Sequence, residues 1–147
     1  MLKVVIDTNL LIDGAADFYS YCSRILDAVI AGQIEAFANR ATLRENQFIT
    51  PKKITDSSYL NKLTFYFDAV RLVENSEKAF ASEDEQDNKL LESAVASNAD
   101  FLITSDHHLL KLENYHGTKI VRPEEFWNIY QDKTSDGWKE WLKKFIS

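Results

Sequence analysis

The sequence has little cysteine, which limits the kinds of site it can build. Cys22 is the single cysteine among 147 residues. One cysteine excludes an intramolecular disulfide framework and any zinc site that needs several cysteines. Cys22 also lies among apolar residues at helical spacing, so we expect it to pack in the core rather than to act as a nucleophile.

Long apolar runs are missing too. The N-terminal stretch MLKVVIDTNLLID is apolar but only about a dozen residues long, whereas a membrane-spanning helix needs about 20. It carries an aspartate at its centre and lacks the small-residue cleavage site of a signal peptide. We therefore expect a cytoplasmic protein with neither a signal peptide nor a transmembrane span.

The third absence is an excess of positive charge. Lys and Arg number 17 against 23 Asp and Glu, and the net charge of −6, taken alone, argues against a basic nucleic-acid-binding domain. The charge is unevenly distributed. Residues 74–106 hold nine acidic and two basic side chains, whereas residues 39–73 hold six basic and three acidic ones. The net charge of the whole chain therefore conceals one acidic segment, residues 74–106, and one basic segment, residues 39–73.

The composition is that of an ordinary globular protein, 45% apolar and 27% charged, without repeats, low-complexity tracts or linkers. The length fits one domain over residues 1–147. Short apolar runs predict buried strands at 2–6, 34–38, 101–104 and 118–121. Because helical segments separate these runs, we predict an α/β fold, a three-layer α/β/α sandwich around a central parallel sheet of about four to five strands.

Helical spacing and capping residues predict the segments between the strands. We expect helices at 17–31, from Asn39 to about Phe48, from Ser57 or Ser58 to about Arg71, at 87–97 and from Pro123 onward. Pro51 should interrupt the second of these, and the polar stretch 75–86 should form a loop.

The tail should form a last helix. Over residues 134–147 one stripe carries Trp138, Trp141, Leu142 and Phe145. We expect this helix to pack on the domain, with a contact to a second copy or a partner protein as the alternative.

Two aspartates follow predicted strands directly or nearly so. Asp7 comes after VVI, and Asp106 comes after FLITS. Ligands of open parallel sheets bind at the carboxyl ends of the strands, so both carboxylates should enter one crevice. Burying such charges unpaired is costly, and Mg²⁺ or Mn²⁺ is a natural partner for oxygen ligands. The alternative is that each aspartate merely caps the next turn.

Two further acids could complete this set. Glu45 lies in a predicted helix between apolar residues, and its alternative role is that of a solvated helix charge. Asp87 precedes the LLESAVA segment, and its alternative role is that of the N-cap of this helix.

Three segments together resemble the PIN-domain nuclease family. They are VVIDTNLLI, the glutamate in RATLRENQ, and DEQDNKLLESAVASNADFLITSDHHLL. More narrowly, they resemble the VapC-like PIN proteins assigned as toxins of toxin–antitoxin systems. The resemblance covers about residues 2–125, so residues 134–147 lie outside it.

The resemblance implies a catalytic quartet, Asp7, Glu45, Asp87 and Asp106, that binds one or two Mg²⁺ or Mn²⁺ ions. Asn9 and Thr104 match polar residues that support this quartet. Asp84 and Glu92 are candidates for supporting positions as well, with solvated charges as the alternative. Gln86 departs from the family, since many relatives carry an aspartate there. His107 and His108 stand where relatives often have a basic–acidic pair; they could assist proton transfer or contact phosphate, but a surface or turn position is the alternative.

The implied activity is that of a metal-dependent endoribonuclease, a hydrolase that leaves 5′-phosphate and 3′-hydroxyl ends. The implied biological role is the toxin of a toxin–antitoxin pair, with a cognate antitoxin and a homodimer as partners and no membrane. The alternatives are a non-catalytic PIN-like module that binds RNA or protein, and a solitary RNA-processing nuclease.

The basic segment offers an RNA-binding surface. Its candidate phosphate contacts are Arg40, Arg44, Lys52, Lys53 and Lys62. Phe48, Tyr59 and Tyr66 lie between them and could stack on unpaired bases. The alternative is a helical hairpin with a solvated basic face.

Overall fold

The computed structural model describes residues 1–17, 20–75 and 77–132, and a central sheet runs through it. The sheet has the order β3-β2-β1-β4-β6-β5. Its strands are β1 (Lys3–Ile6), β2 (Glu35–Ala38), β3 (Arg71–Leu72), β4 (Phe101–Ile103), β5 (Asn114–Tyr115) and β6 (Thr118–Val121). All pairs are parallel except β5 with β6. The predicted parallel sheet is confirmed, with short edge strands β3 and β5 in addition.

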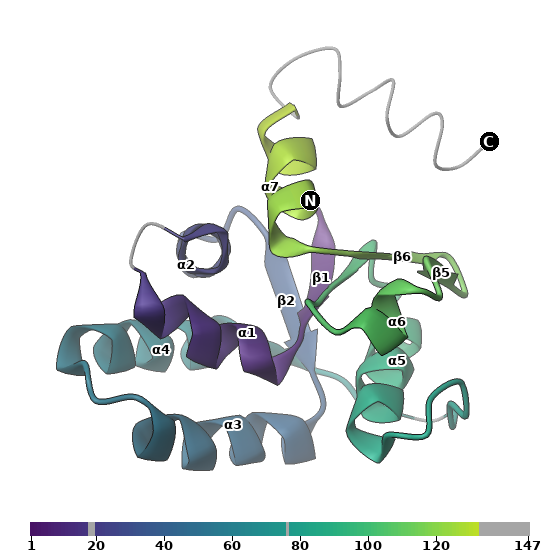
Figure 1. The fold of residues 1–147 in the computed structure, drawn as a ribbon, viewed down its shortest axis with the longest axis horizontal. Helices are drawn as coiled ribbons and strands as arrows, with labels where there is room; N and C mark the ends of the chain where they lie inside the picture. Colours follow the sequence, from purple (N-terminus) through teal and green to yellow (C-terminus); the bar gives the residue numbers. More distant parts are fainter. Residues whose placement is uncertain (18–19, 76, 133–147) are drawn as a thin grey trace.

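Helices cover both faces of this sheet (Figure 1). Their bounds are α1 (Thr8–Asp13), the 3₁₀ helix η1 (Gly14–Ala16), α2 (Tyr21–Ile30), α3 (Arg40–Lys53), α4 (Ser57–Ala69), α5 (Glu85–Ser97), α6 (His107–Leu110) and α7 (Pro123–Asp132). Apolar residues of α1, α2, α4 and α7 form one core, and those of α5 and α6 form the other. The chain is therefore the three-layer α/β/α sandwich that the alternating elements predict.

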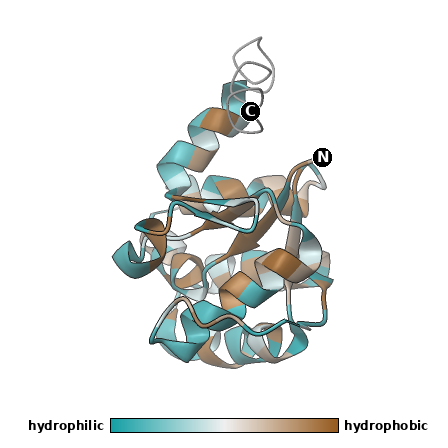
Figure 2. Ribbon diagram, turned by 90° about the vertical axis from the view of Figure 1, so that its right-hand side faces the viewer, coloured by the Kyte–Doolittle hydropathy of each residue, from teal (hydrophilic) through white to brown (hydrophobic). Residues whose placement is uncertain are grey.

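Successive residues of a strand contribute their side chains alternately to the two cores. In β1, Val4 and Ile6 pack against the α2 side, whereas Val5 packs against the α5 side. In β4, Leu102 lies on the α5 side, between neighbours that face the other core. Figure 2 shows the strands mostly as brown, apolar ribbon, whereas the surrounding helices carry both apolar and hydrophilic residues. Burial on both faces explains why the strands read as unbroken apolar runs.

Cys22 lies at the edge of the α2-side core, as expected. Burial raises the pKa of its thiol to about 11, which keeps the thiol protonated and disfavours a nucleophilic role. In the described part of the chain, no helix is both long and apolar enough to cross a bilayer. The helix predicted over 134–147 lies outside the described residues.

One predicted helix end is wrong. The helix that begins after the Asn39 cap continues through Pro51 to Lys53. Proline lacks an N–H donor, so the carbonyl four residues earlier loses one helical hydrogen bond, and the helix ends two residues after Pro51. Hydrogen bonds at Thr50 continue across this point, since its hydroxyl donates to the Asn46 carbonyl at 2.8 Å and its carbonyl accepts from the Ile54 N–H at 2.9 Å.

A second correction concerns the start of α5. Asp84, and not Asp87, is its N-cap, because Asp84 Oδ1 accepts a hydrogen bond from the Gln86 N–H at 2.8 Å. At the other end, Asn98 adopts the left-handed conformation with φ 53°, which asparagine tolerates better than most residues. Asp87 therefore does not cap the helix and lies in the first turn of α5.

The orientation of α1 depends on a buried hydrogen bond from α4. The fully buried Tyr59 hydroxyl donates to the Leu11 carbonyl at 2.5 Å. Replacing Tyr59→Phe should lower the free energy of unfolding by about 1–3 kcal/mol, because the carbonyl loses a buried donor.

Chemical denaturation measures this loss. The matched control is Tyr21→Phe, whose ring lies on the surface at 37% exposure and whose stability should stay near that of the wild type. Equal small losses in both variants would show that the Tyr59 hydrogen bond contributes little.

Candidate functional site

The site begins at Asp7, where β1 ends. The Asp7 N–H donates to the Ile103 carbonyl at 3.0 Å, which holds this residue in register with β4. Its side chain is 6% exposed. Oδ1 accepts from the Asn9 N–H at 3.1 Å, which makes Asp7 the N-cap of α1, and Oδ2 accepts from the Thr104 hydroxyl at 2.8 Å. Both carboxylate oxygens are therefore held in fixed directions.

Thr104 ties the ends of the two central strands together. It is fully buried just after β4, and its hydroxyl donates to Asp7 while accepting from the Asp106 N–H at 3.0 Å. β1 lies between β2 and β4, so the sheet extends from it in both directions. Such a point of divergence is where open α/β sheets bind ligands.

Asp106 begins α6. Its Oδ1 accepts from the His108 N–H at 2.8 Å, so Asp106 is the N-cap of this short helix. The capping alternative considered from the sequence is thus true of both Asp7 and Asp106. It does not conflict with a place in a cleft, because the half-buried Asp106 lines two cavities at once.

The third aspartate, Asp87, comes from α5. Its side chain is 5% exposed, and the Ser82 hydroxyl donates to its Oδ2 at 3.2 Å. Burial raises the pKa of Asp87 to about 6, helped by the charges of Asp106, Asp84 and Asp7 and opposed by the Ser82 hydrogen bond. The pKa of Asp7 is raised as well, first by burial and then by the charges of Asp106 and Asp13, although its two hydrogen bonds act against the rise.

Two cavities meet at Asp106. The larger one, about 730 Å³, is lined by residues 81–84, Asp87, Asp106, His108 and Lys111. The smaller one, about 380 Å³, is lined by Asp7, Asn9, Ile12, Asp13, Ser105 and Asp106. Asp7, Asp87 and Asp106 therefore share one edge of the sheet and sense one another's charge.

The other predicted acids occupy different positions. Glu45 is exposed on α3 and lines neither cavity. Glu92 is half-buried further along α5 and also lies outside both cavities, whereas the exposed Asp84 lines the larger one. Among residues 1–17, 20–75 and 77–132, no three His, Cys, Asp or Glu side chains are close enough to hold one metal ion in the present arrangement.

The donor set still fits a divalent cation in its chemistry. Asp7, Asp87 and Asp106 offer carboxylate oxygens alone, which are the ligands that Mg²⁺ and Mn²⁺ prefer. Burial is the first cause of the raised pKa of Asp87, and the negative charges of Asp106, Asp84 and Asp7 add to the rise. A bound cation would offset this charge and favour the ionised carboxylates.

The basic candidates separate into two groups. Arg40, Arg44, Lys52 and Lys53 are all exposed on α3. The Lys52 ammonium lies 3.8 Å from the centre of the Phe48 ring, which is itself 66% exposed. Lys62 instead joins α4 to α2, because its ammonium pairs with Asp27 at 2.7 Å and donates to Ser23.

One prediction about aromatic stacking is wrong. Tyr59 and Tyr66 are 0% and 5% exposed and belong to the α2-side core, so they cannot stack on bases. Their spacing along a helix fits burial as well as it fits a surface stripe. Phe48 is the member of this set that reaches solvent.

The sequence reasoning also missed residues that shape the larger cavity. Ser82 is fixed by Asn88, whose amide donates to the Ser82 carbonyl at 2.7 Å and whose Oδ1 accepts from the Ser82 N–H at 3.0 Å. Lys111 lines the cavity from the end of α6. The position of Ser82 depends on the conformation of the loop before α5, and the sequence of this loop has no periodicity that predicts that conformation.

Comparisons with known proteins agree with this geometry. A family model described as PIN domain matches residues 3–108. An uncharacterised protein of Methanocaldococcus jannaschii is 30% identical over 140 residues, which span 85% of this chain and 89% of that protein. A chain in the crystal structure of VapBC2 from Rickettsia felis, bound to a DNA fragment from its promoter, superimposes with a TM-score of 0.55. That match covers 82% of this chain and 98% of the other at 14% identity, so it shows a shared fold.

The raised pKa of Asp87 predicts a pH-dependent change in stability. A carboxyl whose folded-state pKa exceeds its unfolded value costs stability as the pH rises through the folded value, here about 6. Asp87→Asn removes that cost and keeps an oxygen that accepts from Ser82. In metal-free buffer the variant should exceed the wild type at pH 7 by on the order of 1 kcal/mol, with little difference at pH 4.

Chemical denaturation in EDTA at the two pH values measures this difference. Asp68→Asn, at an exposed position of α4, is the control and should shift stability equally at both pH values. An Asp87→Asn variant that is no more stable than the wild type at pH 7 would contradict the raised pKa of Asp87 and its cost to stability.

Proposed function

Because the chain belongs to the PIN-domain family, we propose that it is a metal-dependent endoribonuclease that hydrolyses RNA phosphodiester bonds. The observation that carries this proposal is the meeting of Asp7, Asp87 and Asp106 at the edge of the sheet where two cavities join. Burial and the charges of neighbouring aspartates raise the pKa values of Asp7 and Asp87, and a bound cation would offset this negative charge.

In this proposal Asp7, Glu45, Asp87 and Asp106 form the catalytic, metal-binding quartet. One or two Mg²⁺ or Mn²⁺ ions would supply Lewis-acid activation of water and stabilise the charge of the phosphodiester transition state. The place of Glu45 rests on the family resemblance, supported by the contact between α3, which carries it, and α1, which Asp7 caps.

The supporting residues orient the carboxylates. Thr104 and the Asn9 N–H fix the two oxygens of Asp7, and Thr104 also holds the backbone of Asp106. The His108 N–H donates to Oδ1 of Asp106 and so holds one oxygen of that carboxylate. Ser82 does the same for Asp87 from the loop, with Asp84 capping the helix beside it. These hydrogen bonds preorganise the donor set before a cation or a substrate enters.

RNA is the proposed substrate. The exposed basic residues of α3, with Phe48 among them, offer contacts to phosphates and to one unpaired base. Because Lys62 is held against Asp27, the proposed surface centres on Arg40, Arg44, Lys52 and Lys53. The cleft itself remains acidic, so RNA affinity should depend on the cation bound there.

We also propose the biological role of a toxin that acts in the cytoplasm. The VapBC2 complex, one chain of which shares this fold, is the basis for proposing a partner protein of the antitoxin kind, and the proposed homodimer rests on the family resemblance alone. The second candidate, a non-catalytic module that binds RNA or protein, is favoured by one observation, the position of Glu45 outside both cavities. A solitary RNA-processing nuclease is the third possibility, and a small neighbouring gene for a DNA-binding antitoxin would distinguish the toxin from it.

Cleavage assays test the proposed reaction. Purified protein is incubated with structured and unstructured RNA in Mg²⁺, in Mn²⁺ and in EDTA. We expect cleavage with either cation and none in EDTA. Asp106→Asn should lower the rate by more than about 100-fold, because loss of supporting groups alone costs metal sites 10–100-fold.

Asp68→Asn serves again as the control, since it removes the same charge from an exposed position of α4 and should cleave at the wild-type rate. RNA left equally intact by wild type and Asp106→Asn under every metal condition would exclude the enzymatic function. Equal cleavage by both would show either a contaminating nuclease or a site elsewhere.

The same cleavage assay tests whether Glu45 binds the cation together with the three aspartates. If Glu45 binds the cation, Glu45→Gln should reduce cleavage by at least about tenfold, and a higher Mg²⁺ concentration should restore part of the rate. Wild-type kinetics for Glu45→Gln at low Mg²⁺ would remove Glu45 from the site and leave the three aspartates.

A further inference from the structure

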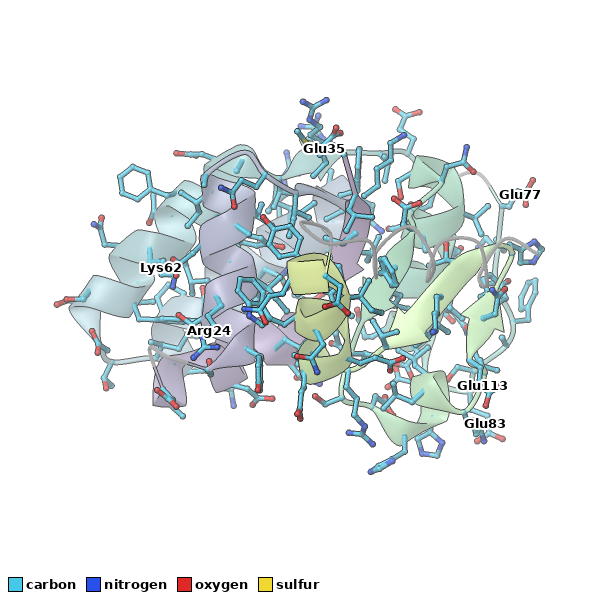
Figure 3. All side chains as sticks on the ribbon, turned by 90° about the horizontal axis from the view of Figure 1, so that it is seen from above. Arg24, Glu35, Lys62, Glu77, Glu83 and Glu113 are labelled. Carbon is cyan, nitrogen blue, oxygen red and sulfur yellow. The ribbon has the colours of Figure 1, made fainter. Side chains whose placement is uncertain are left out.

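A groove lies between α2 and α7, away from the acidic cleft. This α2–α7 groove has a volume of about 250 Å³ and is lined by Arg24, Asp27, Ala28, Ala31, Gln33 and Trp127. Figure 3, which looks down on α7, shows Arg24 and Glu83 on opposite sides of this helix, and Glu83 lines the larger cavity of the cleft. The groove is therefore a separate feature of the surface and not an extension of the candidate active site.

One wall of the groove is a face of α2 with little side-chain bulk at its centre. Arg24, Ala28 and Ala31 follow one another at spacings of four and three residues, so they lie on one side of this helix. Ala28 is buried, whereas Ala31 is exposed. Because each alanine ends in a single methyl group, bulky apolar side chains of another segment can approach the backbone of α2 there.

The other wall is Trp127, whose indole N–H lacks a hydrogen-bond partner. The indole nitrogen Nε1 is buried, and no acceptor reaches it within the part of the chain that the structure describes. The half-buried ring packs against Tyr130 of the same helix, with the ring centres 5.3 Å apart. Buried polar groups in folded proteins are nearly always paired, so the unpaired N–H indicates that a neighbour of Trp127 is missing.

The chain contains a segment whose pattern suits this groove. The tail segment, residues 133–147, follows α7 directly. Four of its residues form an apolar stripe at helical spacing, namely Trp138, Trp141, Leu142 and Phe145. Asp136 and Gly137 stand just before the stripe and favour a turn. A connection over residues 133–137 matches the length of about 2–5 residues that joins antiparallel helices in helical hairpins.

The lengths of the two helices also match. α7 has ten residues and therefore spans about 15 Å, and a helix over residues 138–147 would have the same length. Trp127 lies five residues before the end of α7 at Asp132, which is about 7.5 Å along the helix axis. A returning helix that starts beside Asp132 reaches this level near Leu142. Its apolar stripe therefore passes over Trp127.

The charges of the two segments are complementary. α7 carries Glu124, Glu125 and Asp132 and no basic residue, and although Glu125 pairs with Lys119 at 3.5 Å, the helix itself is acidic. Residues 138–147 carry three lysines and one glutamate. Exposed charge pairs add little stability, but they favour this pairing over the contact of two acidic helices.

We propose that residues 138–147 form a helix that folds back antiparallel to α7 and occupies the α2–α7 groove of the same chain. The apolar stripe covers Ala31 and Trp127, and the groove is the surface that removes the stripe from water. This inference does not depend on the proposed nuclease function, because the groove and the acidic cleft lie on different sides of α7.

Hydrogen exchange of the full chain tests this docking. A helix over residues 138–147 alone is shorter than the about 12–15 residues that isolated helices need in water, so slow exchange of its amides reports packing. We expect these amides to be protected in the wild type. Ala31→Arg places a long charged side chain in the groove, and this variant should abolish the protection while the amides of α5 stay protected.

Matched variants control for changes that do not concern the groove. Ala41→Arg introduces the same side chain at an exposed position of α3 and should keep the protection. Leu142→Asn, on the stripe, should abolish it without altering any described residue, whereas Lys143→Asn, off the stripe, should keep it. Fast exchange in the wild type, protection that survives Ala31→Arg or Leu142→Asn, or an equal loss in Ala41→Arg would overturn the proposal.

Nuclear Overhauser effects distinguish the same chain from a second copy in the groove. The Trp127 indole N–H should show such effects to side chains of residues 141–145 within one molecule. Isotope-filtered spectra of mixed labelled and unlabelled protein should show none between molecules. Effects that occur only between molecules, or protection that falls on dilution, would assign the groove to a second copy and contradict the proposal.

Discussion

The structure depends on a constraint at the carboxyl edge of its sheet, where three aspartates lie near one another and the ion pairs found among the described residues involve none of them. Asp7 and Asp87 are each at least nine-tenths buried, and Asp106 lies between them at the junction of two cavities. Burial and mutual repulsion both raise the pKa values of Asp7 and Asp87. A fold designed for stability alone would not retain these charges, so the arrangement is best understood as a site that a cation completes.

The rest of the fold holds this edge in place. Apolar strands buried on both faces bring β1 and β4 side by side, and the Thr104 hydroxyl links the residues that follow them. The third aspartate, Asp87, lies on α5, and two hydrogen bonds between Ser82 and Asn88 hold the loop that precedes this helix. Residues 81–84 of the same loop line the larger cavity, so the loop that positions Asp87 also shapes the site.

Much of this could be predicted from the sequence, because the informative residues follow regular elements. Asp7 and Asp106 come after apolar runs whose burial on both faces is evident, and the sandwich follows from alternating strands and helices. Short elements such as α6 and β5 lack the length that periodicity needs. Helical spacing alone cannot tell a buried face from an aromatic surface stripe, so it predicts Tyr59 and Tyr66 on the RNA-binding surface although both lie in the core. The loop residues that line the larger cavity are positioned by the hydrogen bonds between Ser82 and Asn88, which no sequence pattern indicates. Charge shows a similar limit, since the net −6 averages an acidic cleft with the exposed basic face of α3.

The most direct test of the cation site is the pKa of the Asp87 side chain, measured by carbon-detected NMR titration of its carboxyl group with and without Mg²⁺. Without metal the carboxyl should titrate at about 6, above the ordinary 3.8. With saturating Mg²⁺ the pKa should fall, because a bound cation stabilises the ionised form. A pKa near 3.8 in the metal-free protein, or one that Mg²⁺ does not change, would contradict the view that these aspartates form a cation site.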